Sequence, residues 1–297
     1  MPTLASPPVG RFAPSPSGPL HFGSLVAALA SYLQVKSSQG RWLVRIEDID
    51  EPRSQAGAAD SILRSLEQFG LLWDGTIWYQ SQRKARYQAI FDQLYQQGLL
   101  YGCDCPRKAI AAMGGLYNGH CRQRQLSPKH PKPLAWRLCG SSVATEFDDL
   151  ILGKQQLEPD FCQEDYIIKR RDSIFAYQLV VVVDDMDQGV TEVIRGADLL
   201  NMTTRQQQLF AQLGAAAPVY GHIPLASSSP GQKLSKQNHA PALDASQAVP
   251  LLLQALQYLG QATPTELQSA SVSELIAFAV SHWCLEQVPK QTEILLN

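Results

Sequence analysis

The sequence has little that marks an exported or membrane-bound protein. Its 297 residues include only six cysteines, and its longest apolar runs are far shorter than a membrane span. The chain does not open with a basic segment followed by an apolar stretch, so we expect no secretory signal. These absences predict a cytoplasmic protein with no membrane partner, whose cysteines are reduced thiols or metal ligands and not a disulfide framework.

An excess of charge of one sign is also missing. The formal net charge is -2, from 25 Lys and Arg against 27 Asp and Glu. This balance excludes a protein that coats nucleic acid through global positive charge, so any RNA contact has to come from a local patch. The 45% hydrophobic content is typical of a folded globular chain, and the length allows one large domain with attachments.

The stretch from Arg11 to Ser24 is rich in proline, serine and glycine and reads RFAPSPSGPLHFGS. The pattern predicts a strand over residues 9–13, a rigid loop, and a helix that begins near His21. The unpaired N–H groups and the positive dipole of such a helix start suit a bound phosphate, to which His21 can donate. An ordinary structural loop is the alternative, because prolines and glycines build those too.

A second stretch places Lys233 and Lys236 after the polar segment 227–232. Lysines on a flexible loop can close over a triphosphate and neutralise the charge that develops as pyrophosphate leaves. The alternative is that both lysines are solvated surface charges, as most lysines are.

Taken together, the two stretches resemble the HIGH and KMSKS signatures of class I aminoacyl-tRNA synthetases. They stand here as HFGS from His21 and KLSKQ from Lys233, and the residues RIEDID from Arg45 look like the glutamyl branch. The likeness covers roughly residues 9–240. The chain departs from the signatures at three positions, with Ser24 for the second His, Leu234 for Met and Gln237 for Ser.

This resemblance implies an α/β fold, namely a Rossmann-like class I synthetase catalytic domain with a zinc-containing insertion and a C-terminal helical segment. We expect the first half of the catalytic domain in residues 1–102, the insertion in 103–165, the second half with the lysine loop in 166–240, and the helical segment in 241–297. An anticodon-binding domain of the kind that glutamyl-tRNA synthetases carry is not expected. The chain therefore resembles shortened paralogues that activate L-glutamate without tRNA and attach it to the queuosine base in the anticodon of tRNA(Asp).

The resemblance also implies the site residues. Catalytic roles fall to His21, Lys233 and Lys236, and ATP, with Mg²⁺, is expected at His21, Gly23, Ser24 and Lys236. Glutamate binding falls to Arg11, Phe12, Ala13, Pro14, Ser15, Glu47, Tyr177 and Arg195. Such a set suits a zwitterion, because a guanidinium grips a carboxylate and a carboxylate holds an ammonium group. Which arginine takes the side-chain carboxylate stays open, and the family suggests Arg11.

Three cysteines gather in one short, Gly-rich excursion, at Cys103, Cys105 and Cys121. Three close thiolates predict one structural zinc ion, although unrelated buried thiols are the alternative. On chemistry alone the fourth ligand is either Tyr117 or His120, and relatives that supply tyrosine at the matching position favour Tyr117. The other cysteines are expected to be buried and not functional: Cys139, Cys162 and Cys284.

Apolar periodicity predicts the remaining elements. Helices are expected over residues 52–70, 81–97, 249–256 and 273–278, and strands over 41–46, 134–139, 145–157 and 190–195. We expect the strands 134–139 and 145–157 to belong to the insertion and residues 166–170 to rejoin the main sheet. The side chain of Tyr95 is expected to face inward. For residues 180–185, VVVVDD, β-branched propensity predicts a buried strand, whereas the resemblance implies a helix, which we follow.

Two groups of residues are candidates for RNA contact. The basic group, which is either a solvated loop or a site for RNA phosphates, comprises Arg122, Arg124, Lys129, His130 and Lys132. The aromatic group, for which core packing is the favoured role, comprises Trp73, Trp78 and Tyr79. We expect a monomer, without a sequence signal for the oligomeric state. The competing functions are charging of a tRNA 3′ end, a non-catalytic RNA-binding role, and an unrelated nucleotidyltransferase activity.

Overall fold

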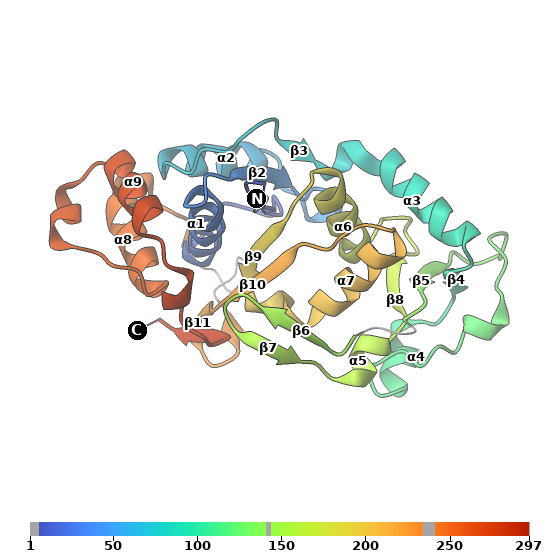
Figure 1. The fold of residues 1–297 in the computed structure, drawn as a ribbon. Helices are drawn as coiled ribbons and strands as arrows, with labels where there is room; N and C mark the ends of the chain where they lie inside the picture. Colours follow the sequence, from blue (N-terminus) through green and yellow to red (C-terminus); the bar gives the residue numbers. More distant parts are fainter. Residues whose placement is uncertain (1–5, 141–143, 234–240, 297) are drawn as a thin grey trace.

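A parallel sheet in two abutting parts forms the centre of the molecule (Figure 1). The structure is a computed structural model, and it describes residues 6–140, 144–233 and 241–296. The first part of the sheet has the order β1 (Val9–Phe12), β2 (Arg41–Ile46) and β3 (Trp78–Tyr79), all parallel. The second part has the order β9 (Glu192–Gly196), β10 (Val219–Ile223), β6 (Glu146–Asp149) and β7 (Gly153–Gln156).

The two parts of the sheet meet where β1 lies beside β9. The N–H of Thr191, just before β9, donates to the carbonyl oxygen of Val9 at 2.8 Å. From this boundary β2 and β3 follow on one side, while β10 and β6 follow on the other. The carboxyl ends of parallel strands are where ligands bind when the strand order reverses, so the boundary between β1 and β9 is the expected place for a site.

Helix α1 (Phe22–Lys36) connects β1 to β2 and packs against both β1 and β9. It is apolar on nearly every side, and Leu25, Leu29 and Leu33 are fully buried. Each such leucine contributes roughly 1.5–3 kcal/mol by leaving water. The side of α1 that faces away from the sheet is covered by α8 (Ala248–Tyr258) and α9 (Val272–His282).

Helix α6 (Tyr177–Asp187) contains the valine run for which β-propensity predicts a strand and the resemblance implies a helix. The helix implied by the resemblance is confirmed, and the strand favoured by β-propensity is wrong. All four valines, Val180 to Val183, are buried because α6 packs against α3 (Lys84–Gln96), α7 (Thr203–Gln212) and β8 (Tyr166–Lys169). Burial on every side overrides an intrinsic preference that spans only about 1 kcal/mol per residue.

The hairpin of β6 and β7 pairs with the main sheet, through Tyr220 of β10 opposite Asp149. Residues 145–157, predicted as strands of the insertion, therefore extend the main sheet. Asp149 fixes the hairpin against β10, because its carboxylate accepts the backbone N–H groups of Ile151 and Leu152 in the hairpin turn and of His222 in β10.

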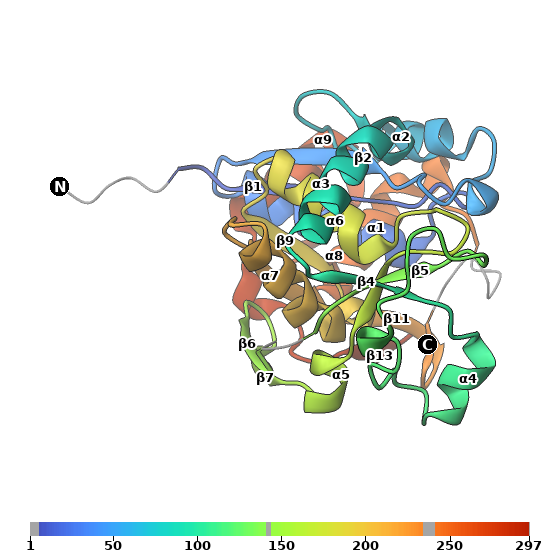
Figure 2. The same cartoon turned by 90° about the vertical axis from the view of Figure 1, so that its right-hand side faces the viewer.

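A separate antiparallel sheet has the order β4 (Leu100–Cys103), β5 (Ala135–Leu138) and β8. The prediction that residues 166–170 rejoin the main sheet is therefore wrong. Tyr166 and Ile168 of β8 instead bury their side chains with Leu138 in a core shared with α3 and α6. This sheet faces the viewer in Figure 2, with α8 and α9 behind.

Smaller elements complete the described part of the chain. They are α2 (Ala58–Gln68), α4 (Arg107–Ala112), α5 (Pro159–Gln163) and the mixed group β11 (Leu225–Ser229), β12 (Gln232–Lys233) and β13 (Glu293–Leu295). Tyr95, in the last turn of α3, was predicted to face inward, but its side chain is 42% exposed and packs edge-on against Trp136 of β5. In the described ranges no helix has the length and apolarity needed to cross a membrane.

Candidate active site

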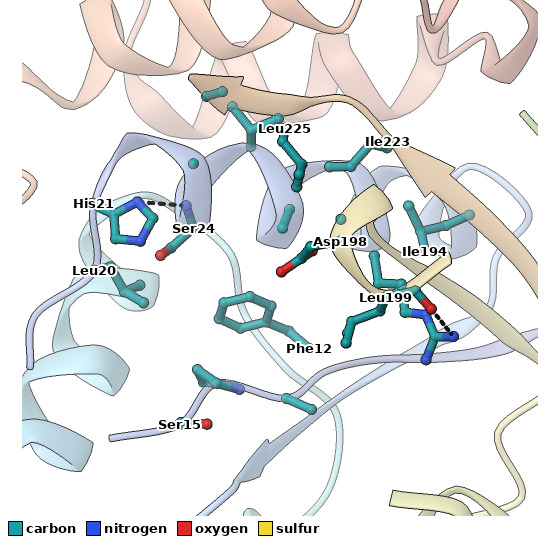
Figure 3. Close-up of a pocket in the computed structure, with 18 of the residues that line it drawn as sticks. Phe12, Ser15, Leu20, His21, Ser24, Ile194, Asp198, Leu199, Ile223 and Leu225 are labelled. Carbon is teal, nitrogen blue, oxygen red and sulfur yellow. Dashed lines mark hydrogen bonds between the residues drawn. The ribbon is translucent and has the colours of Figure 1, made fainter. Parts of the chain in front are cut away.

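A cavity of ≈ 500 Å³ opens at the boundary between β1 and β9 (Figure 3). Its walls come from the carboxyl ends of β1, β9 and β10, the loop after β1 and the start of α1. The cavity brings together every predicted glutamate and ATP residue except Lys236: Arg11, Phe12, Ala13, Pro14, Ser15, His21, Gly23, Ser24, Glu47, Tyr177 and Arg195. Lys236 lies outside the described residues, and for Lys233 only the backbone pairing with Ser227 is described.

The start of α1 carries His21 as its N-cap. The His21 Nδ1 accepts the backbone N–H of Ser24 at 3.4 Å, as Figure 3 shows. In the neutral ring Nε2 then carries the proton and is the atom able to donate to a ligand. A Cβ at position 23 would stand 3.3 Å from the imidazole, so Gly23 gives the ring room against the helix.

Arg11, on β1, is buried and is held by Asp185 at the end of α6. Its Nε donates to Asp185 Oδ1 at 3.2 Å. Among the described residues its hydrogen bonds run through Nε alone, so both terminal nitrogens are available to an anionic ligand. A guanidinium presented in this way can bind a carboxylate with two parallel bonds.

Glu47 follows β2 directly, and its backbone N–H donates to Pro14 of the loop after β1. Within the described ranges its buried Oε1 has no hydrogen-bond partner, and its nearest cation is Arg45 at 3.6 Å. Burial raises the pKa of Glu47 to about 7, against the opposing effect of Arg45 and Arg11. A buried acceptor without a donor is costly, so this oxygen fits the ammonium group of a ligand.

Arg11 and Glu47 are held in place by a group of buried ion pairs around Arg45, which the sequence did not predict. Arg45 is fully buried, with its Nη2 2.8 Å from Asp185 and its Nε 3.5 Å from Asp184. Asp184 also accepts from Tyr87 at 2.8 Å. Burial raises the pKa of Asp185, but Arg11 and Arg45 outweigh it and hold that pKa below its usual value. The only hint in the sequence was a pair of acids at the end of an apolar run.

Arg195 and Tyr177 also line the cavity. Arg195 is 5% exposed, and its terminal nitrogens donate to Gln206 at 2.7 Å and to Thr203 at 3.0 Å. Burial raises the pKa of the Tyr177 phenol, so it remains a neutral hydrogen-bond donor. The charged side chains that line the cavity are thus two guanidinium groups, from Arg11 and Arg195, and the carboxylates of Glu47 and Asp198.

Cys103, Cys105 and Cys121 converge, with their sulfur atoms all within 4.8 Å of one another. The hydroxyl of Tyr117, which is buried, accepts the backbone N–H of Cys121 at 2.7 Å. His120 is exposed and lies outside this cluster of the described residues. Three thiols and an adjacent phenol fit the donor number and softness that zinc prefers.

The other three cysteines differ in burial. Cys162 is buried as predicted, whereas Cys139 and Cys284 are half-buried.

The two groups of candidate RNA-binding residues make contacts within the protein. In the basic group Arg122 pairs with Asp165 and Arg124 with Asp104, so carboxylates offset part of the positive charge of this group. The predicted core packing is confirmed for Trp73 and Tyr79, while the Trp78 ring lies 4.1 Å from the guanidinium of Arg83.

A cavity at the reversal point of a parallel sheet, next to a helix start with a histidine cap, is the arrangement that the sequence resemblance predicts. Residues 9–263 match the family described as tRNA synthetases class I (E and Q), catalytic domain. The chain belongs to this family of aminoacyl-tRNA ligases.

Curated relatives are similar over nearly the whole chain and carry the name glutamyl-Q tRNA(Asp) synthetase. The protein from Serratia proteamaculans is 55% identical over 97% of this chain and 94% of its own length. The one from Pectobacterium atrosepticum is 54% identical over 96% of this chain and 88% of its own. The predicted resemblance to the shortened glutamyl paralogues is confirmed.

Solved structures show the same fold at low sequence identity. A glutamate tRNA ligase from Elizabethkingia meningosepticum, in complex with its amino acid, gives a TM-score of 0.78 at 23% identity, over 96% of this chain and 66% of that one. The glutamate-tRNA synthetase from Elizabethkingia anophelis gives 0.79 at 22%, over 98% of this chain and 68% of that one. The Rossmann-like α/β fold is confirmed, and the chain spans about two thirds of these longer proteins.

Proposed function

We propose that this protein activates L-glutamate with ATP, without tRNA, and transfers the glutamate to the queuosine base in the anticodon of tRNA(Asp). The observation that carries the proposal is the cavity lined by Arg11, Arg195 and Glu47, in which the buried Oε1 of Glu47 accepts no hydrogen bond from the described residues. That charge pattern matches an amino acid with an ammonium group and two carboxylates. The names of the curated relatives support the same substrates.

In the first step the α-carboxylate of glutamate attacks the α-phosphorus of Mg-ATP, forming glutamyl-adenylate and releasing pyrophosphate. The chain supplies position and charge and no nucleophile. His21 and the start of α1 hold the phosphates, and Lys233 and Lys236 neutralise the leaving pyrophosphate. In the second step a hydroxyl of the modified base attacks the glutamyl carbonyl and releases AMP.

A second cavity of ≈ 740 Å³ adjoins the first and shares Ser15, Ser17, Glu47 and Tyr177 with it. Its wall includes Gln80, fully buried, whose Oε1 has no hydrogen-bond partner among the described residues. The acceptor nucleoside enters here, because a hydroxyl brought in from this side reaches the shared wall. Acceptors such as Gln80 Oε1 suit the donors of a hydroxylated, amine-bearing base.

Glutamate-dependent exchange between ATP and labelled pyrophosphate, by the purified full chain without tRNA, tests the activation step. Among a panel of amino acids we expect exchange with glutamate alone. A flat trace with every amino acid would leave only the non-catalytic RNA-binding role. Exchange with a different acid would point to an unrelated nucleotidyltransferase.

The transfer step is tested by digesting tRNA(Asp) after labelling with glutamate. We expect the label on the anticodon fragment, and none on tRNA(Asp) prepared without queuosine. Label on the 3′-terminal fragment would favour the runner-up, a truncated synthetase that charges the tRNA end. The proposal places this reaction in the cytoplasm and assigns it to a monomer with a C-terminal helical segment.

We also propose that Cys103, Cys105, Tyr117 and Cys121 hold one structural zinc ion, which fixes the loops of the insertion. The variant Cys105→Ser is expected to reduce bound zinc from about one per chain to near zero and to lower the melting temperature, because metal binding is linked to folding. Elemental analysis and a thermal melt give both values. Cys284→Ser, at a half-buried cysteine far along the chain, is the matched control.

The fourth ligand is decided by the same measurement on two further variants. Tyr117→Phe should weaken zinc binding, whereas His120→Ala should leave it unchanged because His120 lies outside the cluster. The reverse result would make His120 the ligand.

A further inference from the structure

A histidine and an aspartate that do not line the cavity bind each other behind Arg195. Asp149 ends β6 and His222 lies in β10, and both are buried, at 5% and 0% exposure. Asp149 Oδ2 lies 2.6 Å from His222 Nδ1. Its Oδ1 accepts the backbone N–H groups of Ile151, Leu152 and His222 at 2.9–3.1 Å. Hydrogen bonds to both oxygens thus hold the Asp149 carboxylate in one orientation.

These contacts determine the protonation of His222. An ionised Asp149 only accepts hydrogen bonds, so Nδ1 carries the proton and Nε2 is left as an acceptor. The acceptor is used, because Arg195 Nε donates to His222 Nε2 at 3.0 Å. Burial lowers the pKa of His222 and, despite the hydrogen bond with Asp149, keeps the ring neutral.

Arg195 is held on several sides by neutral groups. Besides His222, it donates to Gln206 Oε1, Thr203 Oγ1 and the carbonyl oxygen of Leu199, the last drawn as a dashed line in Figure 3. These four bonds use four of the five N–H groups of a guanidinium. Within the described ranges no carboxylate forms an ion pair with Arg195, although it is 95% buried and lines the cavity. A buried cation without a counter-ion calls for an anionic ligand.

We propose that His222, fixed by Asp149, is a positioning residue that sets the orientation of Arg195 and so the affinity for the carboxylate of the amino-acid substrate. The identity of that substrate as glutamate rests on the proposed function. Without an acceptor at Nε, the guanidinium turns to find another partner, and its remaining N–H no longer faces the ligand. Asp149 acts one step further away, by fixing the tautomer and the plane of the ring.

Two substitutions separate the two hydrogen bonds of the imidazole. His222→Asn keeps a donor near the position of Nδ1, toward Asp149, and removes the acceptor for Arg195. His222→Gln keeps an acceptor near the position of Nε2. In pyrophosphate exchange we expect His222→Asn to raise the KM for glutamate about 10- to 100-fold, as the loss of a hydrogen bond to a charged group implies. His222→Gln should restore most of it, and the KM for ATP should stay within about twofold in both.

His282→Asn, at an exposed histidine of α9, is the matched control and should change neither KM. An unchanged glutamate KM in His222→Asn, or equal losses in the Asn and Gln variants, would overturn the proposal. Equal increases in both KM values would also overturn it, because they would indicate a merely structural role.

A second readout does not depend on the reaction. NMR of protein labelled with ¹⁵N-arginine should show a protected Nε–H signal for Arg195, assigned through its loss in Arg195→Lys. The signal should persist in His222→Gln and vanish in His222→Asn. Its persistence in His222→Asn would refute the positioning role. Absence of glutamate exchange in the wild-type protein, with this NMR pattern intact, would refute the proposed substrate alone.

Discussion

The variant Glu47→Gln should lose about 100- to 1,000-fold in kcat/KM for glutamate in pyrophosphate exchange, while the KM for ATP changes little. The substitution keeps the size of the side chain and removes the charge that we assign to the substrate ammonium group. Hydrogen bonds between charged groups and buried ion pairs are worth about 3–4 kcal/mol, which sets this range. Steady-state exchange kinetics measure it.

Glu51→Gln is the matched control, because Glu51 is an exposed carboxylate four residues further along, which pairs with Lys84 at the surface. It should retain wild-type kinetics. Equal losses in the two variants, or full activity of Glu47→Gln, would remove Glu47 from the site.

The pH dependence of glutamate binding gives an independent check on Glu47. Burial raises the pKa of this carboxyl to about 7, so the free protein carries it protonated below that pH and ionised above it. Only the ionised form attracts an ammonium group. The KM for glutamate should therefore fall as the pH rises from about 6 to 8, and this change should be absent in Glu47→Gln. A wild-type KM that is flat over the range would contradict the assignment.

The second large effect is expected on stability, from Arg45→Met. Arg45 is fully buried and contacts Asp184, Asp185 and Glu47, so its removal deprives three buried carboxylates of a cation that they share. Breaking a buried ion pair in this way costs about 3–5 kcal/mol. In a protein of this size that corresponds to a melting temperature lower by about 5–8 °C.

A thermal melt and a denaturant titration measure the change. Arg41→Met is the control, because Arg41 lies on the same strand with an exposed side chain and should shift the melting temperature by no more than about 2 °C. If Arg45→Met melted with the wild type, the buried ionic group would not be a stability determinant.

Local patterns in the sequence predicted the elements that build the cavity. The Pro- and Gly-rich loop and the apolar run after it placed the start of α1 at His21, and the run from Arg41 to Ile46 is β2 as the structure has it. These features depend on neighbouring residues, so they are visible in the residues alone. Propensity failed at α6, where packing against three other elements decided the outcome.

The parts that the sequence did not predict depend on contacts between distant segments. Asp149 stood within a predicted strand of the insertion, and nothing nearby indicated that it would meet His222, 73 residues later. The ion pairs of Arg45 were not predicted either, because the sequence showed it only as the first residue of RIEDID. Its partners Asp184 and Asp185 lie in the second half of the chain. Such pairs follow from strand order, which local periodicity does not encode.

The hydrogen bond from Thr191 to Val9 has a consequence for how this protein matures. It joins segments separated by 182 positions, so a nascent chain still growing from the ribosome has no complete binding wall until its later half has emerged. Substrates therefore cannot guide the early stages of assembly. Substrates bind and stabilise only the folded protein, after both halves of the chain have packed together. Binding then raises the free energy of unfolding by RT ln(1 + [L]/Kd), where [L] is the concentration of free substrate.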